Sequence, residues 1–401
     1  MSVRLPANIA NIIARLERCG FEGYAVGGCI RDSLLGREIH DWDVASSATP
    51  KQLRACFSGE RLIPTGEKHG TLTLLTDDGP VEITTFRIDG GYSDGRHPDS
   101  VRFVDDIIRD LARRDFTVNA MAYSPRTGLV DPFGGGDDLA AGVLRCVGEP
   151  ERRFREDALR ILRAFRFYAR LQTPDRRDFA IEPETLCAIR HCAPGIARVS
   201  AERISAELCG ILLSRRAHDT LKLMDAYGIW PQVRGVERAI LPPEGLDGVP
   251  HDIAARMAAL LAGLGAAAAA DIMSALRFKN ADIARVRRLI SSLAADIGGD
   301  YALLTLMNRI GAQEAATLLE TRAALGEDAA LRARERLDGL TAEGRCWRLA
   351  GLAVNGGDLI ALGFRGREVG RMLRLLLDSV MRGEPNERES LINTAIKLKA
   401  P

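Results

Sequence analysis

The sequence has little excess charge and no long apolar run. Its 401 residues carry a net charge of +1, which excludes a protein that coats a polyanion with its whole surface and restricts nucleic-acid contacts to local basic patches. No stretch is apolar for long enough to cross a bilayer, so we expect no membrane partner. The first twenty residues read as an amphipathic helix carrying Arg15, Glu17 and Arg18, not as a secretion signal.

The sequence also lacks CxxC motifs and a nucleotide-binding P-loop. The eight cysteines stand singly with no CxxC spacing, which argues against a zinc site and favours a reduced, intracellular chain. We therefore expect a cytoplasmic protein. The pattern GxxxxGK[ST] does not occur, so a P-loop ATPase is disfavoured.

Two kinds of pattern divide the chain. Up to about residue 145, short β-like runs alternate with helical patches, and the best strand candidates are 23–28, 41–45, 71–75 and 81–86. From about residue 148 onward the periodicity is helical, without a strand signal. The sequence predicts an α+β fold, in which a head with a small sheet precedes an all-helical remainder.

Two aspartates in the run HDWDVASS form a candidate metal site. If 41–45 is a strand, Asp41 and Asp43 share one face and Trp42 points inward. Two carboxylates that leave room for water and phosphate oxygens suit Mg²⁺. Glu82, in the second strand VEITTFR, is the third catalytic candidate, either as a metal ligand or as a group that polarises the attacking hydroxyl. The alternative is a strand end with solvated acids.

A glycine turn upstream is a candidate triphosphate site. Gly27 and Gly28 follow a strand pattern, and a helix is expected to begin near Cys29. Backbone amides at a helix N-terminus attract phosphate, and Arg31 adds a full positive charge. A plain turn would show the same two glycines.

These motifs together resemble those of a known family. GGCIRDSLLGREIHDWDVAS, RRDFTVNAMAY at 113–123 and DPFGGGDDL at 131–139 are similar to the polymerase-β-like nucleotidyltransferases in the version used by tRNA CCA-adding enzymes and bacterial poly(A) polymerases. The resemblance implies that Arg114 contacts the nucleotide phosphates, that Asp115 holds the ribose and that Asn119 supports this loop. It also implies a fold divided into a catalytic head at 1–147, a neck at 148–215, a body at 216–330 and a tail at 331–401.

The run EDALRILRAFRFYARL at 156–171 predicts a helix with a polar stripe of Asp157, Arg160 and Arg163. A solvated face is one interpretation. The other follows from the resemblance to the base-selecting motif of class II CCA-adding enzymes, carried onto Asp157 and Arg160. Cytosine and adenine each present an amino donor beside a ring-nitrogen acceptor, which matches an Asp–Arg pair and opposes uracil and guanine. Arg163 and Arg166 are expected to be further nucleotide contacts, although Arg166 could instead brace the helix.

The helical remainder resembles the short bacterial CCA-adding enzymes. Glu202 and Arg203, in ARVSAERISAEL, are expected to organise the base-selecting helix. Arginines that follow the turn at 363–366 could grip RNA phosphates; they are Arg367, Arg371 and Arg374.

The function that these motifs imply is Mg²⁺-dependent addition of C, C and A to the 3′ end of tRNA from CTP and ATP, with release of pyrophosphate. The alternatives are addition of the terminal A alone or poly(A) polymerisation, and a small-molecule nucleotidyltransferase is a more distant option. The resemblance also implies an enzyme that can add the terminal A, because the segment 88–106 is intact here, whereas CC-only enzymes of the family differ in it. A homodimer is one possible oligomeric state.

Overall fold

The computed structural model describes residues 3–39, 41–90, 100–171 and 179–399. The chain forms two compact units, Met1–Ala239 and Ile240–Pro401, and each is described by itself. The division into head, neck, body and tail is finer than this and stays a prediction.

A seven-stranded sheet organises the first unit, in the order β3-β4-β5-β2-β1-β8-β9. Its neighbouring strands are antiparallel except for β2 and β5, which run parallel. All four predicted strands are present, as β1, β2, β4 and β5. The strands of the sheet are β1 (Gly23–Val26), β2 (Asp43–Ser46), β3 (Leu62–Gly66), β4 (Thr71–Thr76), β5 (Gly79–Thr85), β8 (Ala122–Ser124) and β9 (Gly128–Val130).

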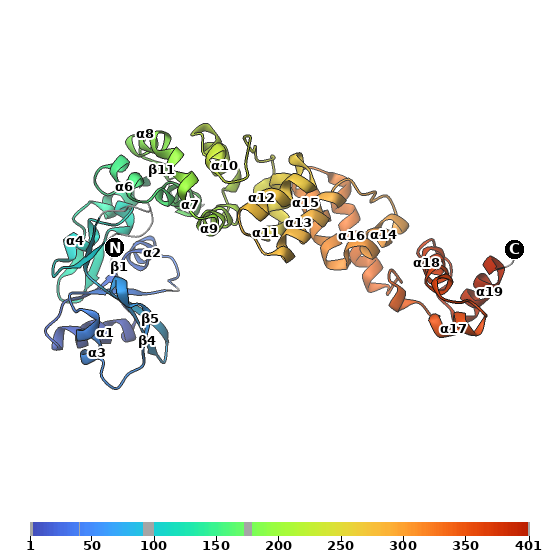
Figure 1. Ribbon diagram of the computed structural model, residues 1–401, viewed down its shortest axis with the longest axis horizontal. Coiled ribbons are helices and arrows are strands. Elements are labelled where there is room, and N and C mark those ends of the chain that lie inside the picture. Colours follow the sequence, from blue (N-terminus) through green and yellow to red (C-terminus); the bar gives the residue numbers. More distant parts are fainter. Residues whose placement is uncertain (1–2, 40, 91–99, 172–178, 400–401) are drawn as a thin grey trace. The chain divides into compact units, whose positions relative to one another are not determined.

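Helices α1 (Ala7–Arg18), α2 (Gly28–Leu35) and α3 (Pro50–Cys56) alternate with the first strands of this sheet (Figure 1). The amphipathic pattern of α1 is confirmed, because the helix buries one apolar face against β1 and β2. Helix α3 begins at a capping box, in which Thr49 and Gln52 exchange hydrogen bonds.

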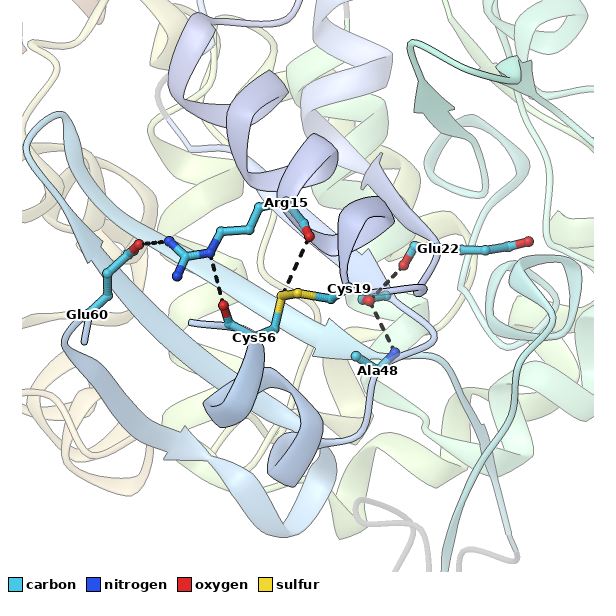
Figure 2. Close-up of a disulfide and its surroundings, with 7 residues drawn as sticks. Arg15, Cys19, Glu22, Ala48, Cys56 and Glu60 are labelled. Carbon is cyan, nitrogen blue, oxygen red and sulfur yellow. Dashed lines mark hydrogen bonds and ion pairs between the residues drawn. A yellow bond between two sulfur atoms is a disulfide. The ribbon is translucent and has the colours of Figure 1, made fainter. Parts of the chain in front are cut away.

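A disulfide joins α1 to α3, so the expectation of a wholly reduced chain was wrong for two of the eight cysteines. Cys19 directly follows α1 and Cys56 ends α3, with Cα atoms 6.1 Å apart. Figure 2 shows hydrogen bonds around this bridge. Arg15 Nε donates to the Cys56 carbonyl oxygen at 2.9 Å, and its guanidinium also pairs with Glu60. These contacts hold the two helices together alongside the disulfide.

The first unit continues with short elements and then with helices. A two-residue strand, β11, departs from the predicted all-helical remainder, because the backbone at 180–182 bonds in parallel to β10 and buries Ile181. The remaining helices and strands are β6 (Arg87–Asp89), β7 (Val101–Phe103), α4 (Ile107–Leu111), α5 (Gly135–Ala141), β10 (Val143–Leu144), α6 (Pro150–Glu156), α7 (Leu159–Leu171), β11 (Ala180–Ile181), α8 (Pro183–Cys192), α9 (Ala201–Leu212) and α10 (Ala217–Ala226). Short 3-10 helices are η1 (Glu67–His69), η2 (Thr117–Asn119), η3 (Ala193–Arg198) and η4 (Trp230–Gln232).

The second unit, over its described residues 240–399, is helical throughout, as the periodicity predicts. Within the described ranges, no helix combines the length and the apolar character that a membrane crossing requires. The α-helices are α11 (Ile253–Leu261), α12 (Ala266–Ala275), α13 (Asn280–Ser292), α14 (Asp300–Ile310), α15 (Ala312–Ala324), α16 (Asp328–Ala342), α17 (Gly356–Ala361), α18 (Arg367–Met381) and α19 (Arg388–Lys399). The 3-10 helices are η5 (Leu246–Gly248), η6 (Ala262–Leu264) and η7 (Leu349–Gly351).

Candidate active site

A polar pocket of about 750 Å³ lies within the first unit. It brings together every site residue predicted from the sequence except Glu82. The residues that line it are Gly28, Arg31, Asp41, Asp43, Arg113, Arg114, Asp115, Asn119, Asp157, Leu159, Arg160, Arg163, Arg166, Phe167 and Arg203.

The two aspartates of the candidate metal site reach the pocket differently from the prediction. Asp43 is the first residue of β2, whereas Asp41 and Trp42 precede the strand, because pairing of β2 with its neighbours begins only at Asp43. The strand-face argument was therefore wrong for Asp41, and Trp42 is half-buried rather than turned into the core. Both carboxylates nevertheless line the same cavity.

Glu82 lies beside Asp43 on the neighbouring strand. The parallel pairing of β2 and β5 sets Asp43 opposite Glu82, and the Glu82 side chain is exposed. It does not line the pocket as Asp41 and Asp43 do. No ion pair in the described chain neutralises any of these three carboxylates.

Burial is the main influence on the pKa of Asp43. The protein packed around its carboxyl raises the pKa of Asp43, and the negative charges of Glu82 and Asp41 raise it further, while Arg114 opposes them. The described residues contain no cluster of three or more His, Cys, Asp or Glu side chains that could enclose a metal ion. Mg²⁺ commonly binds only one or two carboxylates of a protein, so Asp41 and Asp43 beside an open cavity are sufficient.

The glycine turn forms where it was predicted. Helix α2 begins at Gly28, one residue before the expected start, and Gly27 precedes it with φ 79°. A Cβ atom on Gly27 would lie 2.4 Å from Nη1 of Arg114, so any other residue would need a left-handed backbone and would displace this guanidinium. The first turn of α2 carries Arg31, whose Nη1 donates to Asn119 Oδ1 at 2.6 Å. Cations and helix amides therefore meet at one end of the pocket.

Asp115 is a buried carboxylate with a full set of donors. Oδ1 accepts from the Phe116 amide at 2.9 Å and from Asn119 Nδ2 at 3.1 Å, and Oδ2 accepts from Arg163 Nε at 2.8 Å. Burial by itself would raise the pKa of Asp115, but the charge of Arg163 and these hydrogen bonds lower it to about 2. Asp115 is therefore ionised at neutral pH and ties the head motif to α7.

The predicted helix at 156–171 is broken. Helix α6 ends at Glu156, Asp157 is extended with φ −147°, and α7 begins at Leu159. The break has a physical cause: Asp157 Oδ1 accepts from the Leu159 amide at 3.0 Å, and Arg203 donates to both of its oxygens, at 2.6 and 3.3 Å. Asp157 thus lies ahead of the helix that carries Arg160, although both line the pocket.

Arg160 and Arg166 are both anchored by neighbouring groups. Nη1 of Arg160 donates to Glu156 at 2.8 Å and to the Arg153 carbonyl at 3.1 Å, and Nη2 donates to the Arg113 carbonyl at 3.1 Å. Arg166 forms an ion pair with Glu207 of α9, which is the bracing contact that the sequence left open. It also lines the cavity, so bracing and nucleotide contact are compatible.

The sequence analysis missed three residues that line the pocket, and its expected role for Glu202 does not match the structure. Arg113, Leu159 and Phe167 line the pocket without having been singled out. The spacing of four between Arg163 and Phe167 was a usable signal, since such residues share a helix face. Arg203 holds Asp157 as expected, but the Glu202 side chain is exposed and is paired with none of the described residues.

The chain is similar to known proteins over nearly its whole length. Residues 23–145 match the poly A polymerase head domain, and residues 178–237 match the probable RNA and SrmB-binding site of polymerase A. The CCA-adding enzyme of Lactobacillus delbrueckii subsp. bulgaricus is 35% identical over 95% of both chains, and that of Limosilactobacillus fermentum is 34% identical over 96% of both.

A solved structure supports the same relationship. The CCA-adding enzyme of Bacillus stearothermophilus, crystallised with CTP, is 31% identical and superimposes with a TM-score of 0.82 over 97% of this chain and 96% of its own. A Thermotoga maritima CCA-adding enzyme complexed with tRNA shares the fold at 20% identity and a TM-score of 0.69. The nucleotidyltransferase head, the helical remainder and similarity over nearly the whole length show that the chain belongs to the family of CCA-adding enzymes.

Proposed function

We propose that this chain adds C, C and A to the 3′ end of tRNA from CTP and ATP and releases pyrophosphate. The observation that carries the proposal is a single pocket that is lined by two carboxylates that form no ion pair with the described residues, by a glycine turn with arginines, and by the Asp157–Arg160 pair. The first set suits a metal ion, the second a triphosphate and the third a base. The relatives named above act as CCA-adding enzymes, and this chain matches them over nearly their full length.

Asp41 and Asp43 are the proposed Mg²⁺ ligands, with Glu82 beside them. The residues fit a divalent ion, because three negative charges stand close enough for Glu82 and Asp41 to raise the pKa of Asp43, and no nearby lysine or arginine of the described chain pairs with them. When bound, Mg²⁺ supplies charge stabilisation at the reacting phosphate and activates the attacking 3′ hydroxyl. The protein itself holds the two carboxylates at the start of β2.

Phosphate and ribose contacts follow from the arginine end of the pocket. The amide end of α2 at Gly28, with Arg31 and Arg114, offers donors to the triphosphate. Asp115 is proposed to accept from a ribose hydroxyl, supported by Asn119. Since Asp115 already accepts from Phe116, Asn119 and Arg163, a bound ribose must displace or share one of these donors.

The proposed base selection uses groups that are still available. Three hydrogen bonds occupy Nη1 and one N–H of Nη2 on Arg160, which leaves Nε–H and the second Nη2–H to donate to a ring nitrogen of C or A. Asp157 is held by Arg203 and the Leu159 amide, and its remaining lone pairs can accept from the exocyclic amino group. Uracil and guanine would face each group with the wrong partner. Arg163 and Arg166 complete the nucleotide contacts.

We assign tRNA binding to the neck, body and tail sections. On α18, Arg367, Arg371 and Arg374 are exposed and form no ion pair with any residue that the structure describes, so they can meet phosphates. Replacing all three with alanine should weaken tRNA binding about tenfold and flatten its salt dependence. Arg382 of the same helix, which is paired with Asp378, is the matched control. An unchanged salt slope would refute the assignment.

We place the reaction in the cytoplasm, where tRNA, CTP and ATP meet. The Cys19–Cys56 disulfide is unusual for a reducing compartment. The hydrogen bond from Arg15 to Cys56 and its ion pair with Glu60 would keep α1 on α3 with the thiols reduced.

The deciding experiment is product sequencing with tRNAs that end before the first C, after C and after CC. Completion of all three substrates to CCA with CTP and ATP supports the proposal. Extension only of the substrate that ends in CC would identify an A-adding enzyme, and long A tails would identify a poly(A) polymerase. The segment 88–106, which favours terminal A addition, lies partly outside the described residues.

A further inference from the structure

Three arginines of the pocket surround the ring of Phe167. The guanidinium carbons of Arg166, Arg31 and Arg163 lie 4.5, 5.3 and 5.3 Å from its centroid. Arg31 belongs to α2 of the head, whereas the other two belong to α7. A buried phenyl ring with a cation within about 6 Å of its centroid attracts that cation through its quadrupole. Phe167 therefore joins cations from two elements that are distant in the sequence.

Acid partners hold each arginine from its other side. Arg31 pairs with Asp32, Arg163 with Asp115 and Arg166 with Glu207. Three like charges around one ring repel one another, so both the acids and the ring are needed to keep them together.

The backbone also makes room for this arrangement. A Cβ atom on Gly210 would lie 2.6 Å from Arg166 Cδ, so α9 approaches Arg166 closely only because residue 210 is glycine. Phe116 meets Phe167 edge to face, with centroids 5.7 Å apart. Phe116 is fully buried and does not line the pocket, whereas Phe167 does.

We propose that Phe167 is a positioning residue for the nucleotide triphosphate. Its ring presets the guanidinium groups of Arg31, Arg163 and Arg166 around the space that the phosphates enter. This inference rests on the proposed function, since it assigns that space to CTP and ATP. A phenyl ring serving only as core would depend on its shape, whereas this role depends on the negative face of the ring.

The role predicts a specific kinetic pattern. Weakening the ring's quadrupole should raise KM for CTP and ATP alike, by about tenfold for complete loss of three cation contacts. The turnover number should change less than twofold, because Asp41 and Asp43 are untouched. Preference for C and A over U and G should also persist, because Asp157 and Arg160 keep their contacts.

The test replaces Phe167 with 3,4,5-trifluorophenylalanine, which keeps a similar shape but removes most of the negative charge from the ring face. Phe167→Leu and Phe167→Tyr accompany it. The matched control is Phe165→Leu, because Phe165 is a fully buried ring of the same helix that does not line the pocket. The inference holds if trifluorophenylalanine and leucine raise KM, tyrosine keeps it at the wild-type value, and Phe165→Leu leaves it within twofold. It fails if trifluorophenylalanine leaves KM unchanged, or if Phe165→Leu reproduces the effect of Phe167→Leu.

Calorimetry of CTP binding to the same proteins separates this inference from the proposed function. A wild-type enzyme that adds no nucleotide to tRNA would contradict the proposed function alone. The Phe167 inference would still be read from CTP affinity, and equal affinity in wild type and the trifluorophenylalanine protein would overturn it.

Discussion

The pocket has two sides that differ in whether their carboxylates are paired with arginine. On the acid side, Asp41 and Asp43 have no cationic partner among the described residues, and the pKa of Asp43 is raised. On the arginine side, Asp115 pairs with Arg163 and Asp157 with Arg203, and the pKa of Asp115 is lowered to about 2. The difference shows which anions the protein has already neutralised. The unneutralised ones fit the proposed Mg²⁺ site, and the paired ones fit the proposed nucleotide contacts.

The largest expected effect comes from the acid side. Asp43→Ala or Asp41→Ala should lower the turnover number by roughly 10³-fold, because each removes charge that the metal requires. Binding of tRNA should stay intact, as measured by filter binding. Asp78→Ala, an exposed acid in the turn between β4 and β5, serves as the control. Undiminished turnover in both pocket variants would remove the basis for a metal site here.

The next effect concerns base choice on the arginine side. Arg160→Ala should let UTP and GTP compete roughly 10²-fold better against CTP and ATP, because a donor that opposes the wrong bases is lost. Misincorporation into tRNA that lacks CCA measures this. Arg155→Ala removes an arginine of α6 that is paired with Glu151 and does not line the pocket, and it should leave selectivity alone. Equal selectivity in the two variants would contradict the assignment of Arg160.

A stability effect should distinguish Asp115. Its pKa is about 2 in the folded protein against a usual value of 3.8, so its ionisation stabilises the fold above about pH 4, and this contribution fades as the pH falls toward 2. Asp115→Asn should therefore cost about 2 kcal/mol at pH 7 and progressively less below pH 4. Thermal melts across this range provide the measurement. A loss of stability that is independent of pH would mean that charge is not the reason.

The smallest expected effect is a gain in stability at Asp43, opposite in sign to the loss expected at Asp115. The raised pKa of Asp43 means that its charged form is disfavoured in the folded protein, so at pH 7 the ionised group weakens the fold, and the effect disappears in acid once it is protonated. Asp43→Asn should raise the melting temperature by about 2 °C without metal. Mg²⁺ should stabilise the wild type but not the variant. A variant that melts lower than the wild type at pH 7 would show that Asp43 has a partner after all.

Local patterns in the sequence predict most of the head. Alternation of apolar residues located β1, β2, β4 and β5, and the glycine pair located the start of α2 within one residue. The carboxylate pair, the glycine turn and motif resemblance together predicted eleven lining residues of the pocket. These features are local, because strand periodicity and turn chemistry depend on neighbours in the chain.

Contacts between distant residues account for the errors. Helical periodicity continues through Asp157. The break there is held by a local bond from the Leu159 amide and by Arg203, which lies 46 residues away and which spacing does not reveal. Likewise, the cations around Phe167 come partly from Arg31 of α2. The disulfide between Cys19 and Cys56 spans 37 residues without a motif. Pairings of this kind depend on the folded arrangement, which spacing alone does not contain.

The turn at Gly27 limits how this pocket can be redesigned. Any other residue there would need a left-handed backbone and would also collide with the guanidinium of Arg114. Arginines on α7 can be exchanged one at a time and the outcome measured, but substitution of Gly27 disturbs two components at once. A library that diversifies the pocket should therefore keep this codon constant and vary the positions of α7 that line the pocket.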